Sequence, residues 1–163
     1  MNIFYILSGT PVWVYVIFVY LVIIGVKASR SHDIELTRLA LAPLIFGIWS
    51  LYSFHAKYGL TPTIGGLWAL AGFVGALVGR MLFGRATVTN KKDGIVQFPG
   101  SWYPLVLNLL FFTLKYALGA SYAIMPELRT HAVLWMTDAI ASGLMSGLYA
   151  GRFWQSLVLT KRA

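Results

Sequence analysis

The sequence contains no cysteine and has few charged residues of either sign. Without cysteine the protein has no disulfide, no thiolate metal site and no thiol relay of its own. Charged residues make up 11% of the chain, whereas a soluble domain carries about 25%. So few charges could not cover a water-facing surface, which excludes a soluble enzyme, a disordered chain and a nucleic-acid-binding domain.

The chain is instead rich in apolar residues. Its 163 residues are 58% hydrophobic, its mean hydropathy is +0.73, and its length is typical of one domain. The net charge of +8 does not indicate nucleic acid, because the basic residues sit in short loops between long apolar runs, as orienting charges do in membrane proteins. The sequence therefore predicts a single integral membrane domain over residues 1–163, surrounded by the lipid bilayer.

Five apolar runs are long enough to be membrane-spanning helices. A bilayer core of about 30 Å needs about 20 helical residues to cross it. Pro43 falls in the first turns of the second run and Pro104 near the start of the fourth, where a missing N–H costs least. The predicted fold is an all-α polytopic membrane bundle of five transmembrane helices, with spans at residues 12–26, 39–55, 66–83, 102–124 and 131–154.

The basic residues predict the orientation of this bundle. Ten of the 13 Lys and Arg residues fall on one side, two fall on the other, and Lys115 lies inside a span. Because loops rich in Lys and Arg stay in the cytoplasm, we expect a bacterial inner (cytoplasmic) membrane protein with its N-terminus out and its C-terminus in. The ten are Lys27, Arg30, Arg38, Arg80, Arg85, Lys91, Lys92, Arg152, Lys161 and Arg162, and the two are Lys57 and Arg129.

Residues 86–98, between the third and fourth spans, predict a small cytoplasmic β-hairpin. Residues 86–89 and 95–98 have the composition of strands, and residues 90–94 have that of a turn in which Gly94 supplies a positive φ. A lone hairpin in water is marginal, so we expect it to lean on the membrane or on the helix ends. It is either a solvated connector or a site for a partner or lipid headgroup built on Lys91 and Lys92.

Two ionisable residues lie well inside predicted spans, Lys115 in the fourth and Asp138 in the fifth. Such residues are expensive in a membrane and usually face a partner. Lys115 precedes Glu127 by 12 residues and Asp138 follows it by 11, so a short loop places them within about 2 Å of equal depth. We expect an ion pair that either locks the two helices together or takes part in a proton or substrate relay.

Polar residues extend this pair along both helices. Asn108, Lys115 and Tyr122 share one face of the fourth span, and Asp138, Ser142 and Ser146 share one face of the fifth. The two stripes carry only two charges between them. A relay normally has several titratable groups in line, whereas these stripes have few. The stripes are compatible with a structural role and with a relay.

Small residues form a ridge on the fifth span at four-residue spacing. A small-xxx-small ridge allows another helix to approach backbone to backbone. The predicted packing is intramolecular, between the third and fifth spans, and the alternative is a homodimer seam. The ridge consists of Ala139, Gly143, Gly147 and Gly151, and the third span offers Ala71, Gly75 and Gly79.

His55 and His131 both fall at the outer boundary of the predicted bundle. Two histidines can hold haem in a membrane, although boundary histidines are more often simply amphipathic. We expect no bound metal or cofactor, with haem at these two histidines as the alternative. The sequence contains no HExxH, GxSxG, paired carboxylates or glycine-rich phosphate loop, so we find no catalytic constellation and expect no enzymatic activity.

Two short motifs resemble a known family. The stretch Gly100-Ser101-Trp102-Tyr103-Pro104-Leu105, followed by Phe112-xx-Lys115-Tyr116, resembles a family of small five-span bacterial inner-membrane proteins of unknown function. The layout is also similar to that of CcdC-type proteins, which are associated with cytochrome c maturation. The resemblance implies a bacterial inner-membrane location and supplies no catalytic residue.

Three functions remain open from the sequence. The leading one is a non-enzymatic membrane protein that binds a partner protein or lipid, or assists in the assembly of a complex. The second is a small transporter or proton-coupled carrier that uses Lys115 and Asp138. The third is an accessory protein that binds haem or quinone.

Overall fold

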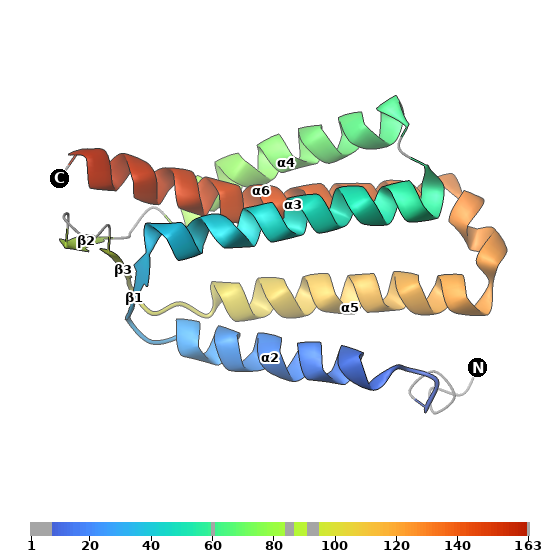
Figure 1. Ribbon diagram of the computed structural model, residues 1–163, viewed down its shortest axis with the longest axis horizontal. Helices are drawn as coiled ribbons and strands as arrows, with labels where there is room; N and C mark the ends of the chain where they lie inside the picture. The colour runs from blue at the N-terminus through green and yellow to red at the C-terminus, as the bar shows by residue number, and fades with distance from the viewer. Residues whose placement is uncertain (1–7, 60, 84–86, 91–94, 163) are drawn as a thin grey trace. The chain divides into compact units, whose positions relative to one another are not determined.

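The computed structural model describes residues 8–59, 61–83, 87–90 and 95–162. The described chain is mostly helical, with helices α2 to α6 and three short strands (Figure 1). Its contacts divide it into two compact units: residues 1–30 with 100–126, and residues 31–99 with 127–163. The first unit contains α2 and α5, and the second contains the sheet, α3, α4 and α6.

Helices α2 (Val12–Ala28) and α5 (Tyr103–Ile124) pack against each other in the first unit. Pro104 lies in the first turn of α5, where no intrahelical N–H partner is lost. The rings of Phe18 and Phe112 are 5.4 Å apart, and the hydroxyls of Thr10 and Tyr116 are 2.6 Å apart. Most of the side chains of α2 stay exposed, although they are aliphatic or aromatic.

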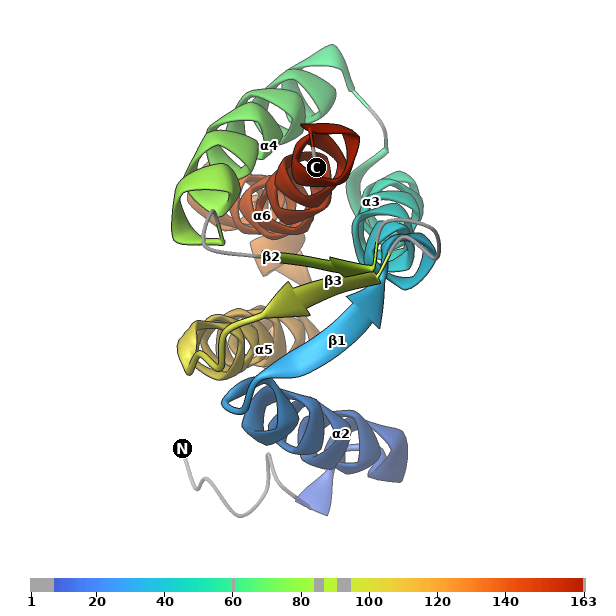
Figure 2. The same ribbon diagram turned by 90° about the vertical axis from the view of Figure 1, so that its left-hand side faces the viewer.

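The second unit is built on α3 (Leu36–Tyr58), α4 (Pro62–Leu82) and α6 (Ala132–Arg162). A short 3-10 helix, η1 (Pro126–Thr130), precedes α6. Both α3 and α4 pack on α6, and α4 runs beside α6 in Figures 1 and 2. The faces of α3 and α4 that point away from α6 carry large exposed apolar side chains, including Ile48, Trp49, Phe73 and Met81.

Local chemistry explains where α4 begins. Thr61 caps α4, because its Oγ1 accepts a hydrogen bond from the N–H of Ile64 at 3.3 Å, and Pro62 occupies the first turn. The helix therefore starts four residues before the predicted residue 66. Helix α3 starts at Leu36 rather than at residue 39, so Pro43 lies in the helix interior and not in its first turns.

The predicted hairpin is confirmed and gains a third strand. Strands β2 (Thr87–Asn90) and β3 (Ile95–Phe98) pair antiparallel, and β1 (His32–Glu35) pairs with the other edge of β3. The strand order is β1-β3-β2 (Figure 2). Strand β1 was not predicted; it leads directly into α3, with Glu35 paired to Ile95. Its addition gives β3 a hydrogen-bonded neighbour on each side, which a lone hairpin lacks.

Two hydrophobic clusters hold the second unit together. One joins the sheet to the helices through Leu39, Phe83, Val96 and Phe98. The other joins α3, α4 and α6 through Phe54, Ile64 and Ala139. The sheet therefore packs on the helices of this unit through Val96 and Phe98, which alternate along β3 with less buried residues.

Among the described residues, three helices are long and apolar enough to cross a membrane: α3, α4 and α5. Helix α2 is apolar but has only 17 residues. Helix α6 has 31 residues and carries Asp138 and Arg152 within its length. Three of the five predicted spans therefore correspond to helices long and apolar enough to cross a membrane, at bounds close to those predicted, and five transmembrane helices stay a prediction.

Candidate functional site

Asp138 is the most deeply buried charged residue in the described part of the chain. The Tyr58 hydroxyl donates a hydrogen bond to its Oδ2 at 2.9 Å. The Lys57 ammonium lies 3.6 Å from the same oxygen. The Asp138 side chain is 1% exposed and that of Lys57 is 36% exposed, so Lys57 connects a buried carboxylate to the surface.

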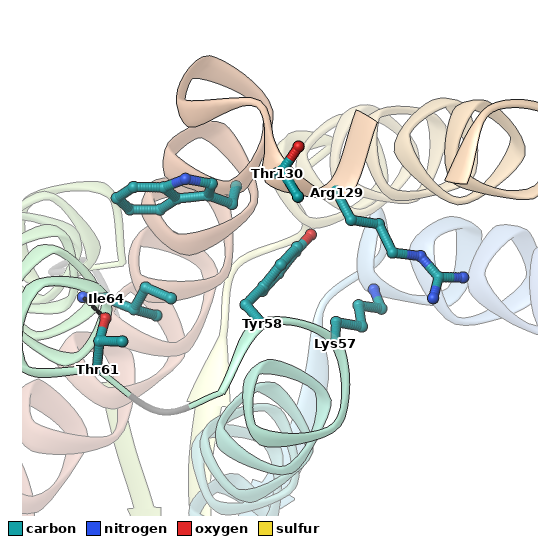
Figure 3. A pocket seen from close by; sticks show the side chains of 7 residues that line it. Lys57, Tyr58, Thr61, Ile64, Arg129 and Thr130 are labelled. Carbon is teal, nitrogen blue, oxygen red and sulfur yellow. Dashed lines mark hydrogen bonds between the residues drawn. The ribbon is translucent and has the colours of Figure 1, made fainter. Parts of the chain in front are cut away.

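A pocket of about 340 Å³ adjoins this pair. It is lined by the last residues of α3, the first turn of α4, η1 and the first turn of α6, all in the second unit (Figure 3). In Figure 3, Lys57 and Arg129 extend together on one side of the pocket, and Thr61 and Ile64 lie on the other. The lining residues are Lys57, Tyr58, Thr61, Ile64, Arg129, Thr130 and Trp135.

The backbone brings these residues together through two short connections. Gly59 follows α3 with φ at 72°, a conformation that glycine adopts without strain, and Thr61 then caps α4 two residues later. On the other side, η1 ends at Thr130, and α6 begins at Ala132. The N-termini of α4 and α6 therefore both border the pocket, and each contributes partial positive charge from its free N–H groups.

The pocket has an excess of positive charge. Lys57 and Arg129 are both cationic at neutral pH, and the nearby Asp138 compensates one of them. Arg129 is exposed and forms no ion pair with any described residue. The Thr61 hydroxyl adds a hydrogen-bond donor, whereas the hydroxyl protons of Tyr58 and Thr130 are donated to Asp138 and to the Glu127 carbonyl. Two cations, one hydroxyl donor and an indole form a donor set that suits a partly apolar anion.

The predicted partner of Asp138 lies in the other unit. Lys115 belongs to α5, and its ammonium lies 5.6 Å from the centre of the Phe111 ring. The pairing of Lys115 with Asp138 joins the two units and stays a prediction. The structure adds Lys57 and Tyr58 as partners of Asp138, and the sequence analysis did not identify either in that role.

The predicted polar stripes are buried on both helices except at Lys115, which is half-buried. Asn108 and Tyr122 are buried on α5. On α6, the buried Ser142 hydroxyl donates to the Asp138 carbonyl at 2.6 Å, and the Ser146 hydroxyl donates to the Pro43 carbonyl of α3 at 3.4 Å. Both serine donors are therefore used by backbone carbonyls, and their relay role stays a prediction.

The glycine ridge of α6 lies against the backbone of α4. A Cβ added to Gly147 would fall 2.7 Å from the carbonyl carbon of Gly72. The same construction at Gly143 and Gly151 meets the carbonyls of Trp68 and Ala76, and at Gly75 and Gly79 it meets the carbonyls of Leu144 and Leu148. Ala71 and Ala139 are buried in the same unit. These close backbone contacts join α4 and α6 of the same chain.

The two boundary histidines are exposed: His55 near the end of α3 and His131 immediately before α6. No cluster of three or more metal-ligating side chains occurs among the described residues. The haem site at His55 and His131 stays a prediction.

A family profile matches the whole chain, residues 1–163. The chain belongs to DUF6622, a family of unknown function. Neither a curated protein nor a solved structure matched the chain. Membership in DUF6622 agrees with the expected resemblance to a family without known function, and the similarity to CcdC-type proteins stays a prediction.

Sequence reasoning missed the pocket, although it singled out two of its residues. Of the 13 basic residues, ten lie on the predicted cytoplasmic side and Lys115 lies within a span. The remaining two are Lys57 and Arg129. Their isolation on the outer side of the predicted bundle was the available signal. The two residues are 72 positions apart in the sequence and line one pocket. Thr61, Thr130 and Trp135 gave no comparable signal, since their meeting depends on how three helix ends pack.

Proposed function

We propose that the protein is a five-span bacterial inner-membrane protein with its N-terminus outside. The three long apolar helices support a membrane location. The 17 residues of α2 extend about 26 Å and the 31 residues of α6 about 46 Å, against a bilayer core of about 30 Å. The exposed apolar side chains of α2, α3 and α4 then face lipid rather than water.

Reporter fusions test this orientation. A reporter active only in the cytoplasm should be active when fused after Ala163 and inactive when inserted near Tyr58. The opposite pattern would reverse the side assigned to every loop and would place the pocket on the cytoplasmic side.

Within this orientation, we propose that the pocket binds the anionic headgroup of a phospholipid of the outer leaflet. The observation that carries the proposal is that Lys57 and Arg129 line the same pocket and that Asp138 is the neighbouring carboxylate. A phosphate accepts charge-assisted hydrogen bonds from both side chains, and the hydroxyl of Thr61 lines the same pocket. Trp135 supplies the amphipathic ring that is common at membrane boundaries.

Retention of lipid through purification tests the headgroup proposal. Native mass spectrometry of the protein should show bound phosphatidylglycerol that is retained in preference to phosphatidylcholine. Lys57→Gln and Arg129→Gln should each reduce this retention, because each removes one cation from the pocket. Lys27→Gln is the matched control, since Lys27 is an exposed cation at the end of α2 and outside the pocket. Equal retention in all four proteins would contradict the proposal.

A second function, proton-coupled transport of the bound anion, is favoured by the contact between Lys57 and Asp138. An anion that draws the Lys57 ammonium into the pocket removes a positive charge from a carboxylate that is 1% exposed. Asp138 is therefore the residue most affected by occupancy of the pocket. Uptake of inorganic phosphate into proteoliposomes by the parent protein, and its loss in Asp138→Asn, would establish a carrier. Uptake no greater than that of empty liposomes would contradict transport, and anion binding would then be the proposed function.

A further inference from the structure

The hydrogen bonds already made in the pocket decide which of its oxygens can donate to a ligand. The Tyr58 hydroxyl gives its proton to Asp138 at 2.9 Å. The Thr130 hydroxyl gives its proton to the Glu127 carbonyl at 2.8 Å. A hydroxyl carries a single proton, together with lone pairs that accept hydrogen bonds. A ligand group placed against either of these two pocket-lining oxygens must therefore donate.

The remaining polar groups of the lining are donors. The ammonium of Lys57, the guanidinium of Arg129 and the indole N–H of Trp135 can only donate. The Thr61 oxygen accepts the Ile64 N–H at 3.3 Å, and its own proton is a further donor. These donors match the oxygens of a phosphate, which accept. A ligand made of phosphate alone would therefore leave the two acceptor oxygens of the pocket to water.

Each acceptor oxygen belongs to the residue that follows a pocket cation in the sequence. Tyr58 follows Lys57 at the end of α3. Thr130 follows Arg129 in η1. In Figure 3 the two cationic side chains extend together, and the Tyr58 hydroxyl points toward Thr130. A ligand that meets both the cations and the acceptors needs a phosphate and a hydrogen-bond donor that are joined by a few bonds.

The charge of the pocket decides between the two kinds of donor that a phospholipid headgroup can carry. An ammonium group donates, but the positive charges of Lys57 and Arg129 repel it. Asp138 compensates only one of these two charges. A hydroxyl group donates without adding charge, so it suits the acceptor oxygens better than an ammonium group does.

We propose that the pocket selects a phospholipid whose phosphodiester headgroup carries hydroxyl groups, as a glycerol headgroup does, and that Tyr58 and Thr130 accept hydrogen bonds from them. This inference rests on the headgroup proposal above and adds the residues that distinguish one anionic headgroup from another. A site that hydrogen-bonds a ligand hydroxyl discriminates against an analogue that lacks it. Because Tyr58 is half-buried and Thr130 is exposed, water replaces the missing hydroxyl in part. We expect a preference of about two- to tenfold, which corresponds to one net hydrogen bond.

Competition between two anionic lipids tests this selection. Phosphatidylglycerol and phosphatidylpropanol with the same acyl chains carry the same charge, and only the first has headgroup hydroxyls. Native mass spectrometry of the protein in an equimolar mixture of the two, with phosphatidylcholine as reference, should show phosphatidylglycerol retained about two- to tenfold more than phosphatidylpropanol. Equal retention of the two anionic lipids would overturn the selection and leave the headgroup proposal intact. Retention of neither lipid above phosphatidylcholine would overturn both.

Two variants test the assignment of the selection to the acceptor oxygens. Tyr58→Phe and Thr130→Val each remove one hydroxyl at nearly constant volume, so each should reduce the preference for phosphatidylglycerol and leave the retention of phosphatidylpropanol unchanged. Thr63→Val is the matched control and should keep the parent's preference, because Thr63 is exposed in the first turn of α4 and lies outside the pocket lining. Thr130→Val keeps the test decisive if Tyr58→Phe, which also removes a partner of Asp138, does not fold. An equal fall in the retention of both lipids would overturn the assignment, since a purely structural effect favours neither headgroup.

Discussion

Replacing Gly147 by leucine tests the packing of α6 on α4, from which the rest of the second unit is built. A Cβ at this position would lie 2.7 Å from the carbonyl carbon of Gly72 and 2.9 Å from the amide nitrogen of Ala76. Ordinary contacts of this kind begin near 3.4 Å. The two helix backbones would therefore have to separate by several tenths of an ångström before any further atom of the side chain is placed.

The magnitude follows from the nature of the neighbours. Overpacking a core usually costs about 1–3 kcal/mol, and occasionally more. Backbone atoms of a helix cannot rotate away as a side chain does, and a local separation also weakens the adjacent contacts at Gly143 and Gly151. We therefore expect Gly147→Leu to lose stability at or above the upper end of that range.

Thermal unfolding in detergent measures this effect, and the chain offers a matched control. Gly66 lies on α4 itself, and a Cβ added there meets nothing within 4 Å. Gly66→Leu should be neutral, or stabilising by up to about 1 kcal/mol, because glycine is a poor helix former. The packing account is wrong if Gly147→Leu unfolds at the same temperature as the parent, or if the two variants lose stability equally.

Two further predictions concern the cap of α4 and the intramembrane charges. Thr61→Ala should lower stability by about 1 kcal/mol, because it removes the acceptor for the Ile64 N–H, whereas the exposed Thr63→Ala should be nearly neutral in the same unfolding assay. Lys115→Met and Asp138→Leu should each destabilise the protein. If these two residues meet, their double-mutant cycle should show coupling on the order of 1–3 kcal/mol, and additive losses would mean that the residues do not meet.

The sequence predicted the helices better than it predicted their starts. Helix α5 begins at Tyr103, one residue from the predicted position, because Pro104 marks its first turn. Helix α4 begins earlier than the predicted residue 66, because Thr61 and Pro62 form a cap that the hydrophobic pattern alone does not indicate. Strand β1 was missed because four residues, two of them acidic, give a weak pattern unless their partner strand is known.

The candidate site was only partly accessible from the sequence, for a physical reason. Asp138 stood out because a charge within an apolar run must be paired. Its contacts with Lys57 and Tyr58 depend on the turn at Gly59 and on the packing of α3 against α6, which are tertiary properties. Arg152 was counted with the basic residues at the C-terminal end, because nothing local shows that Phe98 of β3 packs against it.

The most direct test of the central proposal is a thermal-unfolding series in nanodiscs of phosphatidylcholine with increasing phosphatidylglycerol. Because a ligand that binds only the folded protein raises its stability, we expect the unfolding temperature of the parent to rise with phosphatidylglycerol. The Lys57→Gln/Arg129→Gln double variant should lose this rise, and Lys27→Gln should keep it. A rise in the double variant equal to that of the parent would contradict the assignment of the pocket to an anionic headgroup.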